Sequence, residues 1–254
     1  MIRNVVLGAV GGLAVASSAY AADIYAPSPP APFVAPVPLW SGFYIGVNGG
    51  WGGNSGNEFR ETLHPAVPGY VFAGSGTIDG GFGGGQLGYN FQTANFVYGL
   101  ETDIEGSGIR GPALIAPSVT LPAANIGSMS VDYFGTIRAR VGYSFGGVLL
   151  YGTGGFAYGG VNLGSRFELS PAIYSRFSNS ETLTGWVAGA GIEYKFGSNW
   201  ALKGEYQFID LGSFSTSSPL TTTAYDVRGK TDVAFNTVRV GINYYFNTPY
   251  EPLK

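Results

Sequence analysis

Apolar and polar residues alternate strictly through much of this chain. In "FVYGLETDIEGSG", Phe96 to Gly108, the residues Phe96, Tyr98, Leu100 and Ile104 share one face of a strand, while three acids lie on the opposite face. The same period of two predicts eight strands and an all-β protein. The predicted strands are roughly Gly42 to Asn54, Ile78 to Phe91, Phe96 to Gly106, Val131 to Phe145, Val148 to Leu163, Leu183 to Phe196, Trp200 to Leu211 and Asp232 to Phe246.

The connections between these strands alternate in length. Short connections cover residues 92–95, 146–147 and 197–199, and the others are long and rich in Gly, Ser, Thr and Pro. An even number of strands with alternating short turns and long loops is typical of an outer-membrane barrel. The expected fold is therefore all-β, an eight-stranded antiparallel up-and-down transmembrane β-barrel.

The two faces of each strand indicate which side meets lipid. Between Thr136 and Phe145, one face carries only apolar side chains, while the other carries Thr136, Arg138, Arg140 and Ser144. Aromatic residues also gather beside the short turns, as they do at membrane interfaces. Both observations favour an apolar face toward lipid and charges inside a closed lumen. A soluble sandwich with its charges in water remains the alternative.

The inward face is predicted to hold equal numbers of acids and bases. Enclosed charges are costly unless they are paired, so we expect them to form a lumenal charge network. Turn lengths predict Gln86 opposite Glu101, and Glu193 opposite Lys203. We also expect the acids after Leu100 to meet the arginines of the next strand. The predicted network consists of Glu101, Asp103, Glu105, Arg138, Arg140, Glu193, Lys195, Lys203, Glu205 and Arg239.

The N-terminus predicts export. A short positive start, an apolar core from Val5 to Ala16 and small residues around Ala19–Ala21 are typical of a signal peptide. A transmembrane helix would need a longer apolar stretch. The expected organisation is a signal peptide over residues 1–21, a Pro-rich periplasmic linker over 22–39, the barrel over 40–246 and a C-terminal tail over 247–254.

Composition narrows the possible functions. The chain has 42 Gly, 17 Tyr and 17 Phe but only 13 Lys plus Arg and 16 Asp plus Glu, so few residues could solvate a large surface. Loss of Arg3 with the signal peptide removes one base from a chain of formal net charge −3, and this acidity argues against nucleic acid as a partner. The absence of cysteine excludes disulfides and thiolate metal sites.

Little in the sequence points to catalysis. The single histidine, His64, falls in the first predicted long loop after Ser55 and Glu58, and it is expected to be merely exposed. The runs "GGFGGGQLG" and "GTGGFAYGG" do not precede a helix, so they lack the dipole that would hold a phosphate. We expect no catalytic residue, no cofactor and no metal site.

Several segments resemble a known family. "WSGFYIGVNGGWG", "VYGLETDIEGS", "GTIRARVGYSF", "TGWVAGAGIEYKF" and "VRVGINYYF" are similar to segments of small outer-membrane β-barrel proteins of alphaproteobacteria, the 25/31 kDa outer-membrane protein group related to OmpA-type and opacity-type barrels. The resemblance runs from about Trp40 to Phe246. One departure is the tail "NTPYEPLK", because members of the group commonly end at the aromatic residue of the last strand.

The resemblance implies a location and a set of partners. We expect an integral protein of the outer membrane of a Gram-negative bacterium, inserted by the barrel-insertion machinery and surrounded by outer-membrane lipids and lipopolysaccharide. Its function would be structural, maintaining the envelope, with loops available to a host or cell-surface ligand. The alternative is a small-solute porin or narrow channel, which a lumen filled with paired charges argues against.

Overall fold

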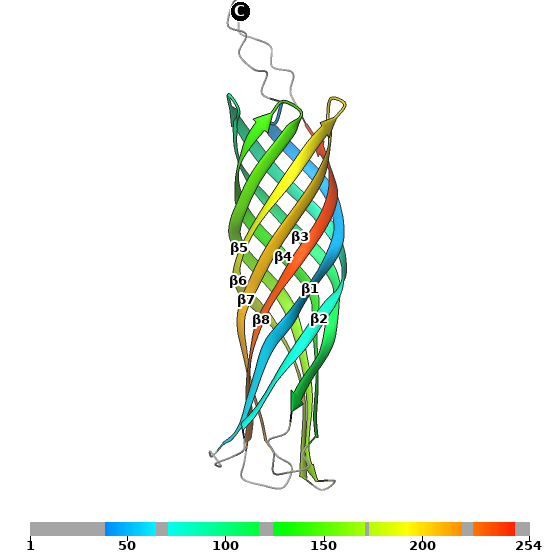
Figure 1. The fold of residues 1–254 in the computed structure, drawn as a ribbon, viewed down its shortest axis with the longest axis vertical. Coiled ribbons are helices and arrows are strands. Elements are labelled where there is room, and N and C mark those ends of the chain that lie inside the picture. Colours follow the sequence, from blue (N-terminus) through cyan, green and yellow to red (C-terminus); the bar gives the residue numbers. More distant parts are fainter. Residues whose placement is uncertain (1–38, 65–70, 117–123, 171–172, 220–225, 247–254) are drawn as a thin grey trace, which may run out of the picture. The chain divides into compact units, whose positions relative to one another are not determined.

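The computed structural model describes residues 39–64, 71–116, 124–170, 173–219 and 226–246 (Figure 1). The predicted signal peptide, nearly all of the predicted linker and the predicted C-terminal tail lie outside the described residues. The described part of the chain contains no helix long and apolar enough to span a membrane.

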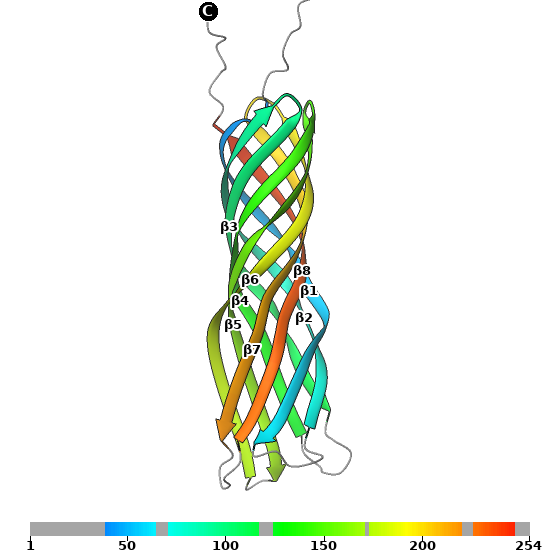
Figure 2. The ribbon, with the colours of Figure 1, turned by 90° about the vertical axis from the view of Figure 1, so that its left-hand side faces the viewer.

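Eight antiparallel strands form one closed barrel in sequence order, and β1 pairs with β8 to complete the ring (Figures 1 and 2). The predicted strand number, antiparallel order and closure are confirmed. The strands are β1 (Gly42–His64), β2 (Val71–Thr93), β3 (Phe96–Ala116), β4 (Ala124–Phe145), β5 (Val148–Ser170), β6 (Ile173–Phe196), β7 (Trp200–Pro219) and β8 (Asp226–Tyr245). The alternative of a soluble sandwich is wrong.

Short turns join the strands at one end of the barrel, here called the turn end, and the opposite end is called the loop end. Gly146 and Gly197 adopt φ values of 69° and 71° at two of these turns, a conformation that glycine reaches without strain. At the turn between β2 and β3, Ala94 takes this role with φ of 52°. Thr93 therefore pairs with Phe96 and only two residues form the turn.

Most strands extend farther toward the loop end than predicted, and several segments expected to be long loops are strand. β2 begins at Val71 instead of near Ile78, and β3 continues to Ala116. His64 is wrongly predicted to lie in a loop, because it is the last residue of β1 and pairs with Asp226 of β8. Where their side chains are described, as at Thr77, Arg110 and Ser128, these extensions lack the apolar outer face by which strands were recognised.

In the half of the barrel next to the turns, the outer face is apolar. Val141 is 54% exposed and Val240 is 58% exposed on that face. Aromatic residues border this apolar belt at both edges, as in barrels that cross a membrane. They are Phe43, Phe91, Phe96, Tyr143, Phe145, Phe196, Trp200 and Phe246 near the turns, and Trp51, Tyr133, Phe156, Trp186 and Tyr206 on the other side.

Toward the loop end the two faces exchange character. The interior there is an apolar core that includes Phe82, Phe134 and Phe235, while the outer face carries exposed polar residues such as Ser128 and Thr182. A β-bulge at Asp132 leaves both Asp132 and Tyr133 exposed and shifts the alternation of β4 by one residue. This half is therefore built like a water-soluble barrel.

Candidate functional site

All ten residues of the predicted lumenal charge network are buried inside the barrel, between its apolar core toward the loop end and its turn end. They come from five strands, β3, β4, β6, β7 and β8. The barrel wall places them in the lumen because each occupies an inward position of a strand whose alternate residues form the apolar belt.

Arg138 of β4 occupies the centre of this network. Its guanidinium group donates to Glu101 and lies 2.8 Å from both Asp103 and Glu205. Glu101 and Asp103 belong to the neighbouring strand β3, whereas Glu205 belongs to β7 on a distant part of the wall. The planar fork of arginine can bind several carboxylate oxygens at once, so this one side chain bridges the lumen.

Two further bases connect the same carboxylates. Lys203 Nζ lies 2.6 Å from Glu101 and 3.3 Å from Glu205. Arg239 Nη1 lies 3.1 Å from Asp103 and 3.2 Å from Glu105. Every one of these side chains is fully buried or nearly so. Each carboxylate that contacts Arg138 therefore has a second base beside it, Lys203 for Glu101 and Glu205, and Arg239 for Asp103.

Arg140 forms a second group nearer the turn end. It donates to Glu193 over 2.7 Å and to the hydroxyl of Tyr44 over 2.8 Å. Its guanidinium carbon lies 3.9 Å from the centroid of the Tyr151 ring, a cation–π contact. Arg140 also lies 3.4 Å from Glu101, which connects the two groups.

Lys195 lies apart from the other bases, at the turn end. Its ammonium group is 4.2 Å from the centroid of the Tyr245 ring and donates to the carbonyl of Leu39. Trp40 is buried beside it, and its indole Nε1 donates to the carbonyl of Gly146 over 3.0 Å. The residues just before β1 therefore cover the lumen at the turn end.

Two predicted pairings need correction. Gln86 lies opposite Asp103 and not Glu101, because the two-residue turn at Ala94 shifts the register of β2 against β3. Glu105 does not meet the arginines of β4. Its ion pair is with Arg239, which reaches it from β8.

One predicted pairing is confirmed. Glu193 lies opposite Lys203, as the turn between β6 and β7 predicted. The side chains nevertheless make their ion pairs with other residues, since Glu193 pairs with Arg140 and Lys203 pairs with Glu101 and Glu205. In a lumen this narrow a charged side chain reaches residues on several strands, so the residue directly opposite it on the neighbouring strand need not be its ion-pair partner.

Three tyrosines belong to the network although the sequence did not single them out. Tyr44 donates to Glu101 and Tyr151 donates to Glu205, each over 2.6 Å, and Tyr245 donates to Glu193 over 2.7 Å. Inward glycines make room for two of the rings. A Cβ at Gly88 would lie 2.4 Å from the Tyr44 hydroxyl oxygen, and one at Gly191 would lie 2.4 Å from that of Tyr151. The sequence did carry a signal for these three tyrosines, because each occupies an inward position of its strand.

Apolar layers bound the charges on both sides. Toward the turn end, Trp40, Leu149 and the tyrosine rings pack together. Toward the loop end, the Phe82 and Phe134 rings lie 5.2 Å apart at their centroids, and the Phe134 and Phe235 rings lie 5.4 Å apart. The lumen thus holds a charged layer between two apolar layers.

Comparison with known proteins agrees with this architecture. The family model described as "Outer membrane protein beta-barrel domain" matches residues 8–246. The 31 kDa outer-membrane immunogenic protein of Brucella melitensis is 38% identical, covering 96% of this chain and all of the relative. The 25 kDa outer-membrane immunogenic protein of Brucella abortus is 29% identical over 96% of this chain and 99% of the relative.

The chain belongs to the outer-membrane β-barrel protein family. Among solved structures, Ail, the attachment invasion locus protein of Yersinia pestis, aligns with a TM-score of 0.31 and 14% identity, covering 78% of this chain and 99% of Ail. The protein is located in the outer membrane, as its relatives' names also state. In outer-membrane barrels the short turns are periplasmic, so the loop end is extracellular.

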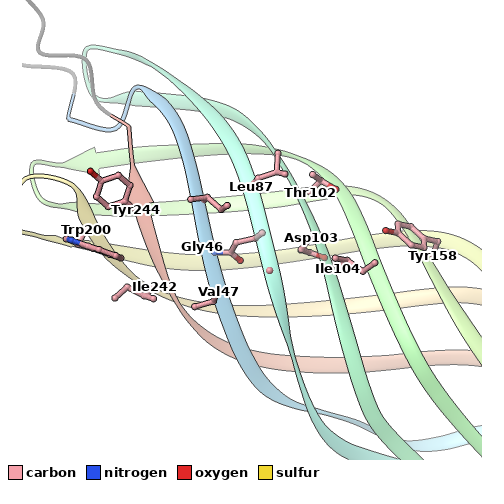
Figure 3. Close-up of a pocket in the computed structure, with 13 residues that line it drawn as sticks. Gly46, Val47, Leu87, Thr102, Asp103, Ile104, Tyr158, Trp200, Ile242 and Tyr244 are labelled. Carbon is pink, nitrogen blue, oxygen red and sulfur yellow. The ribbon is translucent and has the colours of Figure 1, made fainter.

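The apolar belt of this outer-membrane barrel has the height that a membrane requires. On β6 it reaches from Trp186 to Phe196, which matches the roughly 9–11 residues of a transmembrane β-strand. A shallow groove of about 840 Å³ crosses the belt where Gly85 leaves space between Val47, Leu87 and Ile104 (Figure 3). Its apolar lining faces the hydrocarbon layer and not the lumen.

Proposed function

We propose that this protein is a closed structural barrel that maintains the outer envelope, takes part in interactions at the cell surface, and does not conduct solutes. The observation that supports this most directly is the contact of Arg138 with Glu101 on β3 and Glu205 on β7. These contacts cross-link separate parts of the wall through the middle of the lumen. A solute would have to break several charge-assisted hydrogen bonds in a site shielded from water.

The apolar layers strengthen the proposal, because an ion that passed the charges would still meet them. Trp40 closes one side and the Phe134 layer closes the other. Eight-stranded barrels have an interior just wide enough to be filled by their own side chains. The charge network then acts as an internal brace rather than a selectivity filter.

Surface interactions would take place at the extracellular end. The barrel wall continues beyond the apolar belt with exposed hydroxyl-bearing residues such as Ser128 and Thr182. At this height the neighbouring groups are the sugars and phosphates of lipopolysaccharide, and the partners we propose are these lipids and, through the loops, a host or cell-surface ligand. We assign no enzymatic activity to the protein.

Conductance of purified full-length protein in planar bilayers tests the closed lumen. We expect no reproducible single-channel steps, while heat-modifiable migration in gels shows that the same sample is folded, and a large porin serves as the positive control in the same membrane. Steady steps whose ion selectivity changes in Arg138→Gln would overturn the closed-barrel proposal in favour of a narrow channel.

The envelope role is tested separately in cells. Deletion is expected to increase sensitivity to detergent without slowing uptake of small nutrients, and expression of the wild-type chain should restore resistance. A deletion strain with unchanged detergent sensitivity would contradict the structural role. Slower nutrient uptake would instead support transport.

A further inference from the structure

A polar hollow lies on the outer wall of the barrel, on the extracellular side of the apolar belt. It has a volume of about 280 Å³, and its lining comes from β4, β5 and β6, which are neighbours in the ring (Figure 2). Thr182 in this lining lies four residues nearer the loop end of β6 than Trp186, which borders the belt. The hollow is therefore at the level of lipopolysaccharide sugars. The lining residues are Asp132, Tyr133, Gly160, Val161, Asn162, Ser180, Glu181 and Thr182.

A β-bulge brings an acid and an aromatic ring to the same side of this wall. Strict alternation would turn one of two successive residues into the barrel, but the bulge at Asp132 leaves both Asp132 and Tyr133 exposed. Bulges recur beside functional sites because they re-aim a side chain in this way. The interrupted pairing of β4 thus places a carboxylate next to a ring.

The Tyr133 ring rests on a glycine of the neighbouring strand. A Cβ at Gly160 would lie 2.3 Å from Tyr133 Cε1, so the ring occupies the space over this glycine. The Tyr133 hydroxyl lies 2.9 Å from Thr182 Oγ1, which holds the other end of the ring against β6. Tyr133 is nevertheless 38% exposed, so part of the ring remains open to a ligand.

Hydrogen bonds across the three strands hold the polar groups of the hollow in place. Asp132 accepts from Ser130 Oγ over 3.0 Å and from Asn162 Nδ2 over 2.5 Å. Asn162 Oδ1 in turn accepts from Ser180 Oγ. A carboxylate offers about four lone-pair sites, so about two acceptor sites of Asp132 remain for a ligand, and the bonds fix them in position.

We propose that this hollow binds one pyranose ring of a cell-surface oligosaccharide, an inference that rests on the surface-interaction role proposed above. Neighbouring hydroxyl groups of the sugar donate to the Asp132 carboxylate, and the second amide hydrogen of Asn162 is donated to a sugar oxygen. The C–H face of the sugar packs on the open part of the Tyr133 ring, because the face of an aromatic ring is negative. A single ring fits, since 280 Å³ is at the lower end of ligand-pocket volumes.

The charges of the lining distinguish sugar hydroxyls from the other groups at this height. Among the described residues, the charged side chains that line the hollow are both acids, Asp132 and Glu181. They repel a phosphate group, whereas a neutral hydroxyl group donates a charge-assisted hydrogen bond to a carboxylate. A hydrocarbon chain would leave the acceptor sites of Asp132 without donors. The lining therefore selects the sugar part of a glycolipid over its phosphates and acyl chains.

Saturation-transfer NMR on the full-length barrel in detergent tests the site. One probe is the core oligosaccharide released from lipopolysaccharide by mild acid, and the other is a soluble galactose-terminated oligosaccharide of the kind found on animal cells. We expect transfer to the ring protons of one sugar unit in at least one probe. Transfer to the core alone assigns the site to lipopolysaccharide, and transfer to the second probe alone assigns it to a host glycan.

Variants connect the binding to the hollow. Asp132→Ala should raise the dissociation constant about tenfold, because hydrogen bonds to a charged acceptor are lost. Tyr133→Ala should also weaken binding, whereas Tyr133→Phe keeps the ring and should stay within about twofold of wild type. The matched control is Asp232→Ala, which removes an exposed acid of β8 outside the hollow and should bind like wild type. Heat-modifiable gel migration shows that each variant is folded.

Three outcomes would overturn the proposal. The first is no transfer to either oligosaccharide, and the second is equal binding by Asp132→Ala, Tyr133→Ala and the Asp232→Ala control. The third is binding that disappears with a chelator and returns with Ca²⁺, which would show that the acids hold a cation instead of sugar hydroxyls. None of these outcomes bears on conductance or detergent sensitivity, so the closed-barrel and envelope proposals are tested independently.

Discussion

Replacing Arg138 with leucine removes the base that joins most of the lumenal carboxylates. Glu101, Asp103 and Glu205 each lose an ion pair with a fully buried guanidinium group. Leucine fills part of the volume of the arginine side chain but can donate no hydrogen bond. The barrel should therefore remain the same shape while three buried charges lose a partner.

The expected cost is less than three separate ion pairs would suggest. Glu101 and Glu205 still contact Lys203, and Asp103 still contacts Arg239. Removing one partner of a buried ion pair typically destabilises a protein by about 3–5 kcal/mol. We expect Arg138→Leu to fall within that range.

Equilibrium unfolding in detergent, followed by heat-modifiable gel migration and tryptophan fluorescence, measures this loss. With a denaturant slope of about 2–3 kcal/mol per molar urea, the midpoint should fall by roughly 1–2 M. Arg138→Lys should lie between wild type and leucine, because it keeps the charge without the fork. Arg110→Leu, at an exposed position on the outer face, is the matched control and should shift the free energy by less than about 0.5 kcal/mol.

The refuting result is a midpoint for Arg138→Leu that coincides with those of wild type and Arg110→Leu. It would mean that water reaches the carboxylates and solvates them, so that the lumen is not the closed, braced interior inferred from the contacts. The closed-barrel proposal would then lose its main support.

Three further predictions concern other parts of the interior. Trp40→Ala should cost about 3–5 kcal/mol in unfolding free energy, because it empties the packed layer at the turn end. Phe134→Ala should cost a similar amount and expose the loop-end half to protease first. Gly155→Ala should destabilise the barrel by about 1–3 kcal/mol, since its Cβ would lie 2.1 Å from a backbone oxygen. Gly154→Ala is the control and should unfold like wild type, because its Cβ would lie 3.5 Å from the nearest atom. Equal unfolding midpoints for the two alanine variants would show that the backbone around Gly155 can shift to accommodate the Cβ.

The fold of the membrane-spanning half was predictable because lipid and lumen impose a strict alternation. The outward residues of β4 from Ile137 to Val141 lie in the apolar belt and Tyr143 and Phe145 border it, so a charged residue there would be costly, and the pattern is uninterrupted. The extracellular half obeys the opposite rule, with apolar residues inside and hydroxyl groups outside. Bulges at Asp132 and Gly212 also interrupt the period-two alternation. The sequence of these strand segments therefore resembles that of a loop.

The inward side chains were predictable, but their partners were not. Parity along a strand shows that Glu105 points into the lumen, yet only closure and stagger of the barrel bring Arg239 beside it. The register error at Gln86 has a similar origin. Nothing in the sequence marks Ala94 as the residue that adopts the left-handed conformation, because glycine usually occupies such turns.

The exchange of faces along the barrel explains why its extracellular half can remain ordered beyond the lipid. Within the belt, lipid covers the apolar face and ion pairs hold the lumen. Above the belt, water would compete for any polar interior, so the wall is held by Phe82, Phe134 and Phe235 instead. That core depends on neighbouring strands staying paired, and β6 above Gly185 has lost one neighbour. Just above Leu183, the residues of inward parity in β6 are Glu181 and Asn179, and both are solvent-exposed, as expected where that core is no longer enclosed by a paired neighbour.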